Sequence, residues 1–212
     1  MKELANHELD ERLQKQILQA REALKKGGVD YVVQVCGELL KNNPSAYEVR
    51  ALLCETLSAL DRSNSSTVGW LKNKSSGVQF KVSTRSLLKN NPLELVHRCD
   101  EALRKKQALP EVFLALEKAG YALGWLETQV LACQAVVELE PEKSAPRLAL
   151  ARILVEAKRP QQAIDHLEWV LAKEPANGEA QTLLKNASVA ETLQRGNWED
   201  TETTFHTKAK DA

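Results

Sequence analysis

The chain lacks the sequence features of several classes of protein. Its 212 residues include nine glycines and seven prolines, which are too few for the frequent tight turns of an all-β chain. No run of eighteen consecutive apolar residues occurs, and Met1 to Asp10 contain no apolar core of a signal peptide. We therefore expect a mainly helical, soluble protein of the cytoplasm, without a membrane partner.

Charge and motif content also exclude several ligands. The 29 basic residues balance the 29 acidic ones, so no net field attracts nucleic acid. The four cysteines contain no Cys-x-x-Cys pair, and the four histidines form no His-Glu-x-x-His motif, so we expect no metal site. No glycine-rich phosphate loop and no set of nucleophile, base and orienting residue is recognisable. The sequence thus predicts no cofactor, no catalytic residue and no enzymatic activity.

Matching residues recur along the chain at an interval of 34 positions. Examples are Pro141 and Pro175, Cys99 and Cys133, and the run Leu116, Leu150 and Leu184. Recurrence at such a period is typical of a repeat architecture. The register predicts one array over residues 1–212, with units at 13–46, 47–75, 76–109, 110–143, 144–177 and 178–212. The unit 47–75 is irregular, with a loop from Asp61 and a truncated second helix, and the unit 178–212 is degenerate or a capping element.

Each unit has the pattern of two amphipathic helices, because apolar residues recur at three- and four-residue spacing. Helix-breaking residues fall between these predicted helices rather than inside them. Pro160 marks the turn inside the unit 144–177, and Gly27, Gly124 and Gly196 mark predicted helix ends. The sequence therefore predicts an all-α fold of helical hairpins.

This pattern resembles the tetratricopeptide repeat family. The unit 144–177 carries the residues of the family signature Leu150, Ala151, Ala163, Leu167 and Pro175. Arg147 stands where the family usually has an aromatic residue. The resemblance implies a right-handed superhelical solenoid of antiparallel helix pairs that binds a protein or peptide on its concave face.

The resemblance also implies which side chains line that face, namely those of the first helices that do not pack on the second helices. The candidate partner-binding residues are Ile17, Arg21, Phe80, Leu114, Lys118, Tyr121, Leu148 and Arg152. Their mixture of apolar and basic groups suits a partner segment with apolar anchors and acidic residues. Leu114 and Leu148 have an alternative role as interhelix core.

The sequence thus favours a non-catalytic protein-interaction scaffold. The first alternative is a homo-oligomerisation or regulatory module of a larger protein that uses Asp61 to Ser76 as its contact site, and an enzyme is the third option. The four cysteines recur at apolar positions of the repeat, so we expect packed, reduced thiols. His97 and His166 are expected to be solvated.

Overall fold

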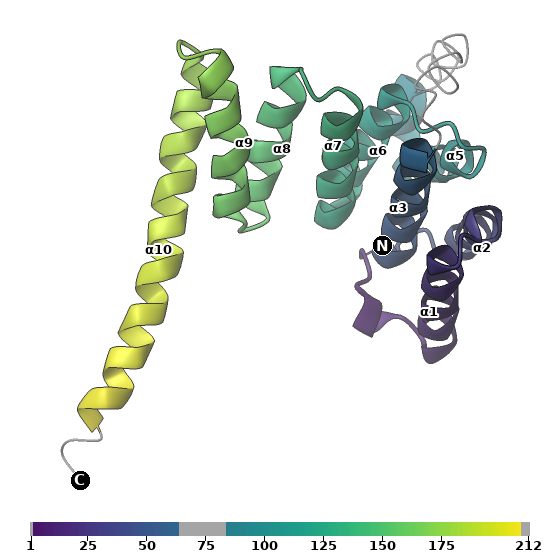
Figure 1. The fold of residues 1–212 in the computed structure, drawn as a ribbon, viewed down its shortest axis with the longest axis horizontal. Coiled ribbons are helices and arrows are strands. Elements are labelled where there is room, and N and C mark those ends of the chain that lie inside the picture. Colours follow the sequence, from purple (N-terminus) through teal and green to yellow (C-terminus); the bar gives the residue numbers. More distant parts are fainter. Residues whose placement is uncertain (1, 64–83, 209–212) are drawn as a thin grey trace. The chain divides into compact units, whose positions relative to one another are not determined.

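The computed structural model describes the backbone of residues 2–63 and 84–208, and the side chains of residues 2–59 and 84–196. The chain divides into two compact units, Met1–Pro141 and Glu142–Ala212, which are described separately. Within the described residues the regular structure is helical, apart from one isolated bridge between Leu4 and Ala46 (Figure 1). The predicted all-α fold is confirmed.

The first unit opens with a short 3₁₀ turn and continues as a succession of helices. These elements are η1 (Asn6–Glu8), α1 (Glu11–Lys25), α2 (Val29–Asn42), α3 (Tyr47–Ser63), a helical stretch at 84–90, α5 (Pro92–Arg104), α6 (Pro110–Leu123) and α7 (Leu126–Leu139). Helix α2 packs against α1 and α3, while α6 packs against α5 and α7. Helix α5 also packs against α2 and α3, so helices that are distant in sequence meet in one core.

Local sequence explains where these helices begin and end. Gly27 and Gly124 have φ angles of 81° and 69°, in the left-handed region that glycine adopts without steric cost. Pro92 and Pro110 occupy the first turns of α5 and α6, where a missing N–H group breaks no helical hydrogen bond. The predicted helix ends at Gly27 and Gly124 are confirmed.

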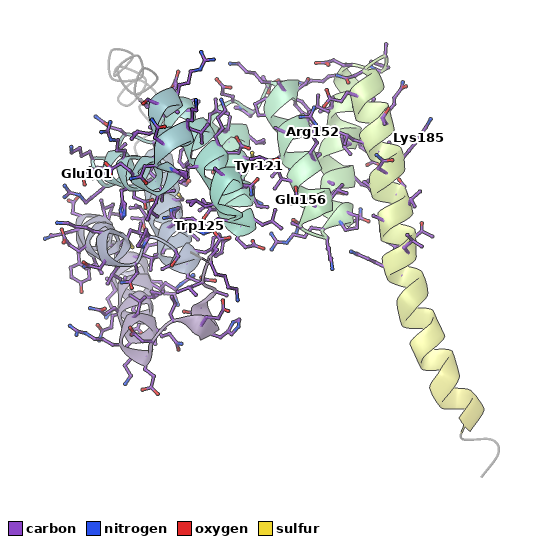
Figure 2. All side chains as sticks on the ribbon, turned by 180° about the vertical axis from the view of Figure 1, so that it is seen from behind. Glu101, Tyr121, Trp125, Arg152, Glu156 and Lys185 are labelled. Carbon is purple, nitrogen blue, oxygen red and sulfur yellow. The ribbon has the colours of Figure 1, made fainter. Side chains whose placement is uncertain are left out.

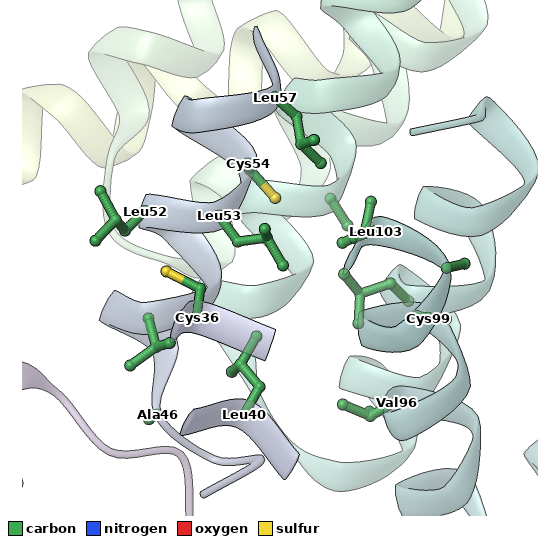
Figure 3. Close-up of a cluster of buried hydrophobic side chains, with 14 of the residues drawn as sticks. Cys36, Leu40, Ala46, Leu52, Leu53, Cys54, Leu57, Val96, Cys99 and Leu103 are labelled. Atoms are coloured by element: carbon green, nitrogen blue, oxygen red, sulfur yellow. The ribbon is translucent and has the colours of Figure 1, made fainter. Parts of the chain in front are cut away.

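The core of the first unit forms where α2, α3 and α5 meet. Figure 3 shows side chains from these three helices in contact, among them Cys36, Leu40, Leu53, Cys54, Val96, Cys99 and Leu103. All four cysteines of the chain are free thiols and buried. The prediction that they act as packed, reduced side chains is confirmed.

Two sequence expectations concern the segment that follows α3. A loop is predicted from Asp61, but α3 continues to Ser63, because Asp61 to Ser63 contain neither proline nor glycine to end the helix. The rest of that segment, the predicted unit boundary at 75/76 and the candidate residue Phe80 all lie outside the described residues.

The second unit consists of α8 (Ser144–Glu156), α9 (Pro160–Lys173) and α10 (Gly178–Lys208). Helix α9 packs against both α8 and α10. Helices α6, α8 and α10 begin at Pro110, Ser144 and Gly178, so their starts are 34 residues apart. The predicted break at Gly196 is wrong, because α10 runs through it without interruption. One glycine costs a helix only about 1 kcal/mol relative to alanine, and no proline lies nearby to reinforce it.

Candidate functional site

Three of the candidate binding residues share one face of α6. Leu114, Lys118 and Tyr121 are spaced by four and three positions, which places them on the same side of a helix. The opposite side of α6 carries buried Phe113, Leu116 and other apolar residues of the core. Leu114 remains 44% exposed and Tyr121 73% exposed, and Tyr121 is labelled in Figure 2. The structure therefore brings this predicted trio together on an exposed face, which we call the α6 face.

The charge on the α6 face comes from Lys118. Its side chain is exposed. The neighbouring Glu117 is half-buried, and that burial raises the pKa of its carboxyl group, while the charge of Lys118 opposes the rise. The α6 face thus presents two large apolar side chains around one available ammonium group.

Two further candidates are buried rather than exposed. Ile17 is only 4% exposed, and it belongs to the same apolar cluster as Leu9 and Leu13. Ile17 lies on the same side of α1 as Leu13 and Ala20, which are buried with it. Leu148 is 9% exposed, and Leu150, Ala151, Ile153 and Leu154 are buried too, so apolar side chains cover more than one side of α8. The expectation that Ile17 and Leu148 are accessible is wrong, and the alternative core role holds for Leu148 but not for Leu114.

The two candidate arginines are already paired with acidic residues of other helices. The Nη2 atom of Arg21 lies 3.0 Å from a carboxylate oxygen of Glu48, and its Nη1 atom lies 3.9 Å from Glu55. Arg152, on α8, forms an ion pair with Glu179 at the start of α10 (Figure 2 labels Arg152). A partner would have to compete with these carboxylates, so both arginines are weaker candidates than Lys118.

The sequence prediction missed a buried polar network in the first unit. Arg50 on α3 is fully buried, and its guanidinium contacts Asp100 of α5 and Thr128 of α7. Thr128 in turn donates its hydroxyl hydrogen to the carboxylate of Glu3. One signal was present in the sequence, because Arg50 and Asp100 each lie on the apolar stripe of an amphipathic helix. Such a position needs a charged or polar partner.

In the second unit, two basic side chains lie over the ring of Trp169 of α9. The guanidinium carbon of Arg147 lies 3.9 Å from the centre of the Trp169 ring, and the Nζ atom of Lys173 lies 4.2 Å from it. Arg147, which occupies the position of the usual aromatic residue, also lies 3.3 Å from Nδ1 of His166. His166 is half-buried, as is His97 of α5, so the expectation that both are solvated is wrong. These contacts join α8 to α9 within the hairpin.

Other kinds of site would be marked by clustered metal ligands or by long apolar helices in the described residues. No group of three or more histidine, cysteine, aspartate or glutamate side chains in this part of the chain is placed to hold a metal ion. Among the helices that the structure describes, none has the length and apolar character needed to span a bilayer.

Comparison with known proteins identifies the repeat. Residues 131–187 match a family model described as tetratricopeptide repeat, a stretch that begins in α7, contains α8 and α9, and ends within α10. Neither the curated proteins nor the solved structures give a match to the chain. Tetratricopeptide repeats generally mediate protein–protein interactions and are generally non-catalytic. Residues 131–187 are thus similar to the tetratricopeptide repeat family.

Proposed function

We propose that the chain is a non-catalytic protein-interaction module, and that the α6 face holds a segment of the partner protein. The observation that carries this proposal is the exposure of Leu114 and Tyr121, which lie on either side of Lys118 on one helix. Large apolar side chains grouped on an exposed surface are typical of interaction sites.

The chemistry of the α6 face defines the partner segment. Full burial of a leucine or comparable apolar side chain contributes about 1.5 to 3 kcal/mol. Because Leu114 is 44% and Tyr121 73% exposed, covering both contributes about 2 to 4 kcal/mol. Ordering a flexible peptide costs about 2 to 5 kcal/mol of this. An acidic residue of the peptide that pairs with Lys118 would add to the favourable free energy of binding. The proposed partner therefore presents an apolar anchor next to a carboxylate.

A displayed peptide library selected against the intact chain tests the proposal. Peptides that bind are expected to contain an apolar residue close to an acidic one, and Tyr121→Ser should weaken their binding at least tenfold. Lys118→Glu should weaken the binding of the acidic peptides and leave far-UV circular dichroism unchanged.

The matched control is Leu18→Ser, because Leu18 is an exposed apolar residue on α1, away from the α6 face. This substitution should leave peptide binding unchanged. Equal loss of binding in Leu18→Ser and Tyr121→Ser, or no loss in either variant, would show that the α6 face is not the binding site.

A second copy of the chain is the other occupant of the α6 face to test, because it could cover the same apolar residues. Sedimentation measured over a range of protein concentrations distinguishes the two cases. A monomer supports binding of a different protein. A concentration-dependent dimer that Tyr121→Ser abolishes would replace that partner with a second copy of the chain.

A further inference from the structure

The residues that precede η1 dock onto the first unit as an extended segment. The backbone N–H of Leu4 donates to the carbonyl of Ser45 at 2.8 Å, and the N–H of Tyr47 donates to the carbonyl of Leu4 at 3.3 Å. These two bonds form the parallel bridge between Leu4 and Ala46, and Figure 1 shows the start of the chain beside α3. The half-buried side chain of Leu4 packs against the hydrophobic core. The contact has the form of a peptide bound along an extended stretch of backbone.

The carboxylate of Glu3 anchors this segment at the first turn of α7. It accepts hydrogen bonds from the backbone N–H groups of Glu127 at 2.9 Å and Thr128 at 2.8 Å, and from the hydroxyl of Thr128. The N–H groups of a first helical turn have no partner within their helix and carry a partial positive charge. The segment thus places a negative charge where the helix favours one.

The buried guanidinium of Arg50 lies next to the Thr128 hydroxyl that binds the Glu3 carboxylate. Arg50 has no exposed surface, and its Nη1 atom donates to the hydroxyl oxygen of Thr128 at 3.2 Å. The hydroxyl of Thr128 therefore accepts from Arg50 while it donates to Glu3. Arg50 is already paired with Asp100, so its charge adds only a secondary preference for an acidic side chain to that of the helix start.

The docked segment is held by few contacts. Glu3 to Ala5 are half-buried, whereas Asn6 to Glu8 are exposed. Burial raises the pKa of Glu3, while its hydrogen bonds to α7 and the charge of Arg50 oppose the rise. Leu9, which follows, is buried in the core and stays with the fold. Ahead of it, two backbone bonds, the Glu3 carboxylate and the Leu4 side chain are contacts that a competing peptide can replace.

We propose that this position, formed by Ser45 to Tyr47 and the first turn of α7, is a peptide-binding site that the chain's own N-terminal segment occupies. The partner is an extended peptide with an acidic residue followed by leucine, and it binds when the N-terminal segment is released. The carboxylate docks on α7, the leucine packs on the core, and the backbone pairs with residues 45–47. This site is separate from the α6 face and does not depend on it.

The test uses the full chain carrying Glu3→Lys, which releases the N-terminal segment because a lysine there is repelled by Arg50 and by the start of α7. The probe is a fluorescent synthetic peptide with the sequence of residues 1–8. Its fluorescence anisotropy should show binding to the Glu3→Lys chain, and at least tenfold weaker binding to the wild-type chain, whose tethered segment competes at high effective concentration. Glu11→Lys, the same charge change at an exposed position of α1, is the matched control and should behave as the wild type.

Changes in the probe test the assigned contacts. A peptide with Glu3→Gln or Leu4→Ala should bind the Glu3→Lys chain at least tenfold more weakly than the wild-type peptide. The backbone amide resonances of Glu127 and Thr128 should shift in the Glu3→Lys chain and return towards their wild-type positions when the peptide is added. Tyr121→Ser, introduced into the Glu3→Lys chain, should leave binding of this probe unchanged, which distinguishes the site from the α6 face.

Several results would overturn the proposal. One is a folded Glu3→Lys chain that does not bind the probe, and another is equal binding of a peptide with scrambled sequence. Glu3→Ala provides a second released chain that introduces no new charge. If both variants lose their helical circular dichroism, the segment is an integral part of the fold and not an exchangeable ligand.

Discussion

Arg50 and Asp100 form a doubly hydrogen-bonded ion pair in the core of the first unit. Nε and Nη2 of Arg50 each lie 2.8 Å from a carboxylate oxygen of Asp100, and Nη2 also donates to the carbonyl of Pro44 at 2.6 Å. The guanidinium carbon lies 5.7 Å from the centre of the Trp125 ring. One side chain of α3 therefore contacts α5 and the residue that precedes α7, which fixes how these helices pack.

Removing one partner of this pair should strongly destabilise the first unit. Arg50→Met leaves the Asp100 carboxylate buried without its cation, and such a change typically costs about 3 to 5 kcal/mol. Urea denaturation followed by circular dichroism measures the loss. The double variant Arg50→Met with Asp100→Leu should lose less than the sum of the two single variants, because no uncompensated charge remains. Additive losses would show that the two residues do not act as a pair.

The sequence predicts the elements of the fold better than their contacts. Gly27 and Gly124 mark helix ends correctly because each takes a left-handed conformation that the local chain requires. Gly196 does not end a helix, because a single glycine permits a helix break without enforcing one. Helical periodicity places Leu114 and Tyr121 on one face, and it also places Ile17 in line with Leu13 and Ala20, on the face of α1 that is buried.

The parts of the site that escape prediction depend on contacts between distant residues. Arg50 contacts Asp100 and Thr128, which lie 50 and 78 positions further along the chain. Periodicity identifies the face of a helix on which a residue lies, but not the helix that packs on that face. The docking of Glu3 on α7 escapes prediction for the same reason.

The cysteines should be unreactive until the first unit unfolds. Burial raises the pKa of Cys36, Cys54 and Cys133 to about 12, and that of Cys99 well above its ordinary value. A thiol-specific reagent at mildly alkaline pH should therefore label none of them in the native chain and all four in strong denaturant. Labelling at intermediate denaturant should follow the unfolding of residues 1–141, which contain all four. A thiol that reacts rapidly in the native chain would contradict its burial.

Two glycine substitutions should have opposite effects on stability. Gly124→Ala places a side chain on a residue with φ of 69°, where an added Cβ meets no atom within 4 Å, so the cost of about 1 kcal/mol is purely conformational. Gly196→Ala lies inside α10 and should instead stabilise this helix by about 0.5 to 1 kcal/mol. Thermal unfolding and far-UV circular dichroism measure both changes. Loss of helicity in Gly196→Ala would show that the chain needs glycine there.

The stability of the second unit should fall as the solution becomes mildly acidic. Burial and the neighbouring charge of Arg147 lower the pKa of His166 from its ordinary 6.5, although Asp165 opposes the shift. Below about pH 6.5 the unfolded chain therefore binds a proton that the folded chain does not. The free energy of unfolding is unaffected by this group above that pH, and it decreases as the pH falls towards the lowered pKa of the folded state.

Urea denaturation at neutral pH and at about pH 5.5 measures this decrease, since histidine titrates in that range. His166→Gln cannot gain a proton, so this variant should lose less stability on acidification than the wild-type chain. His97→Gln is the matched control, because His97 is a half-buried histidine on α5 of the other unit. In His97→Gln, the stability of the second unit should depend on pH as it does in the wild type. An identical pH dependence in His166→Gln and the wild type would mean that the contact between Arg147 and His166 does not set the acid sensitivity of this unit.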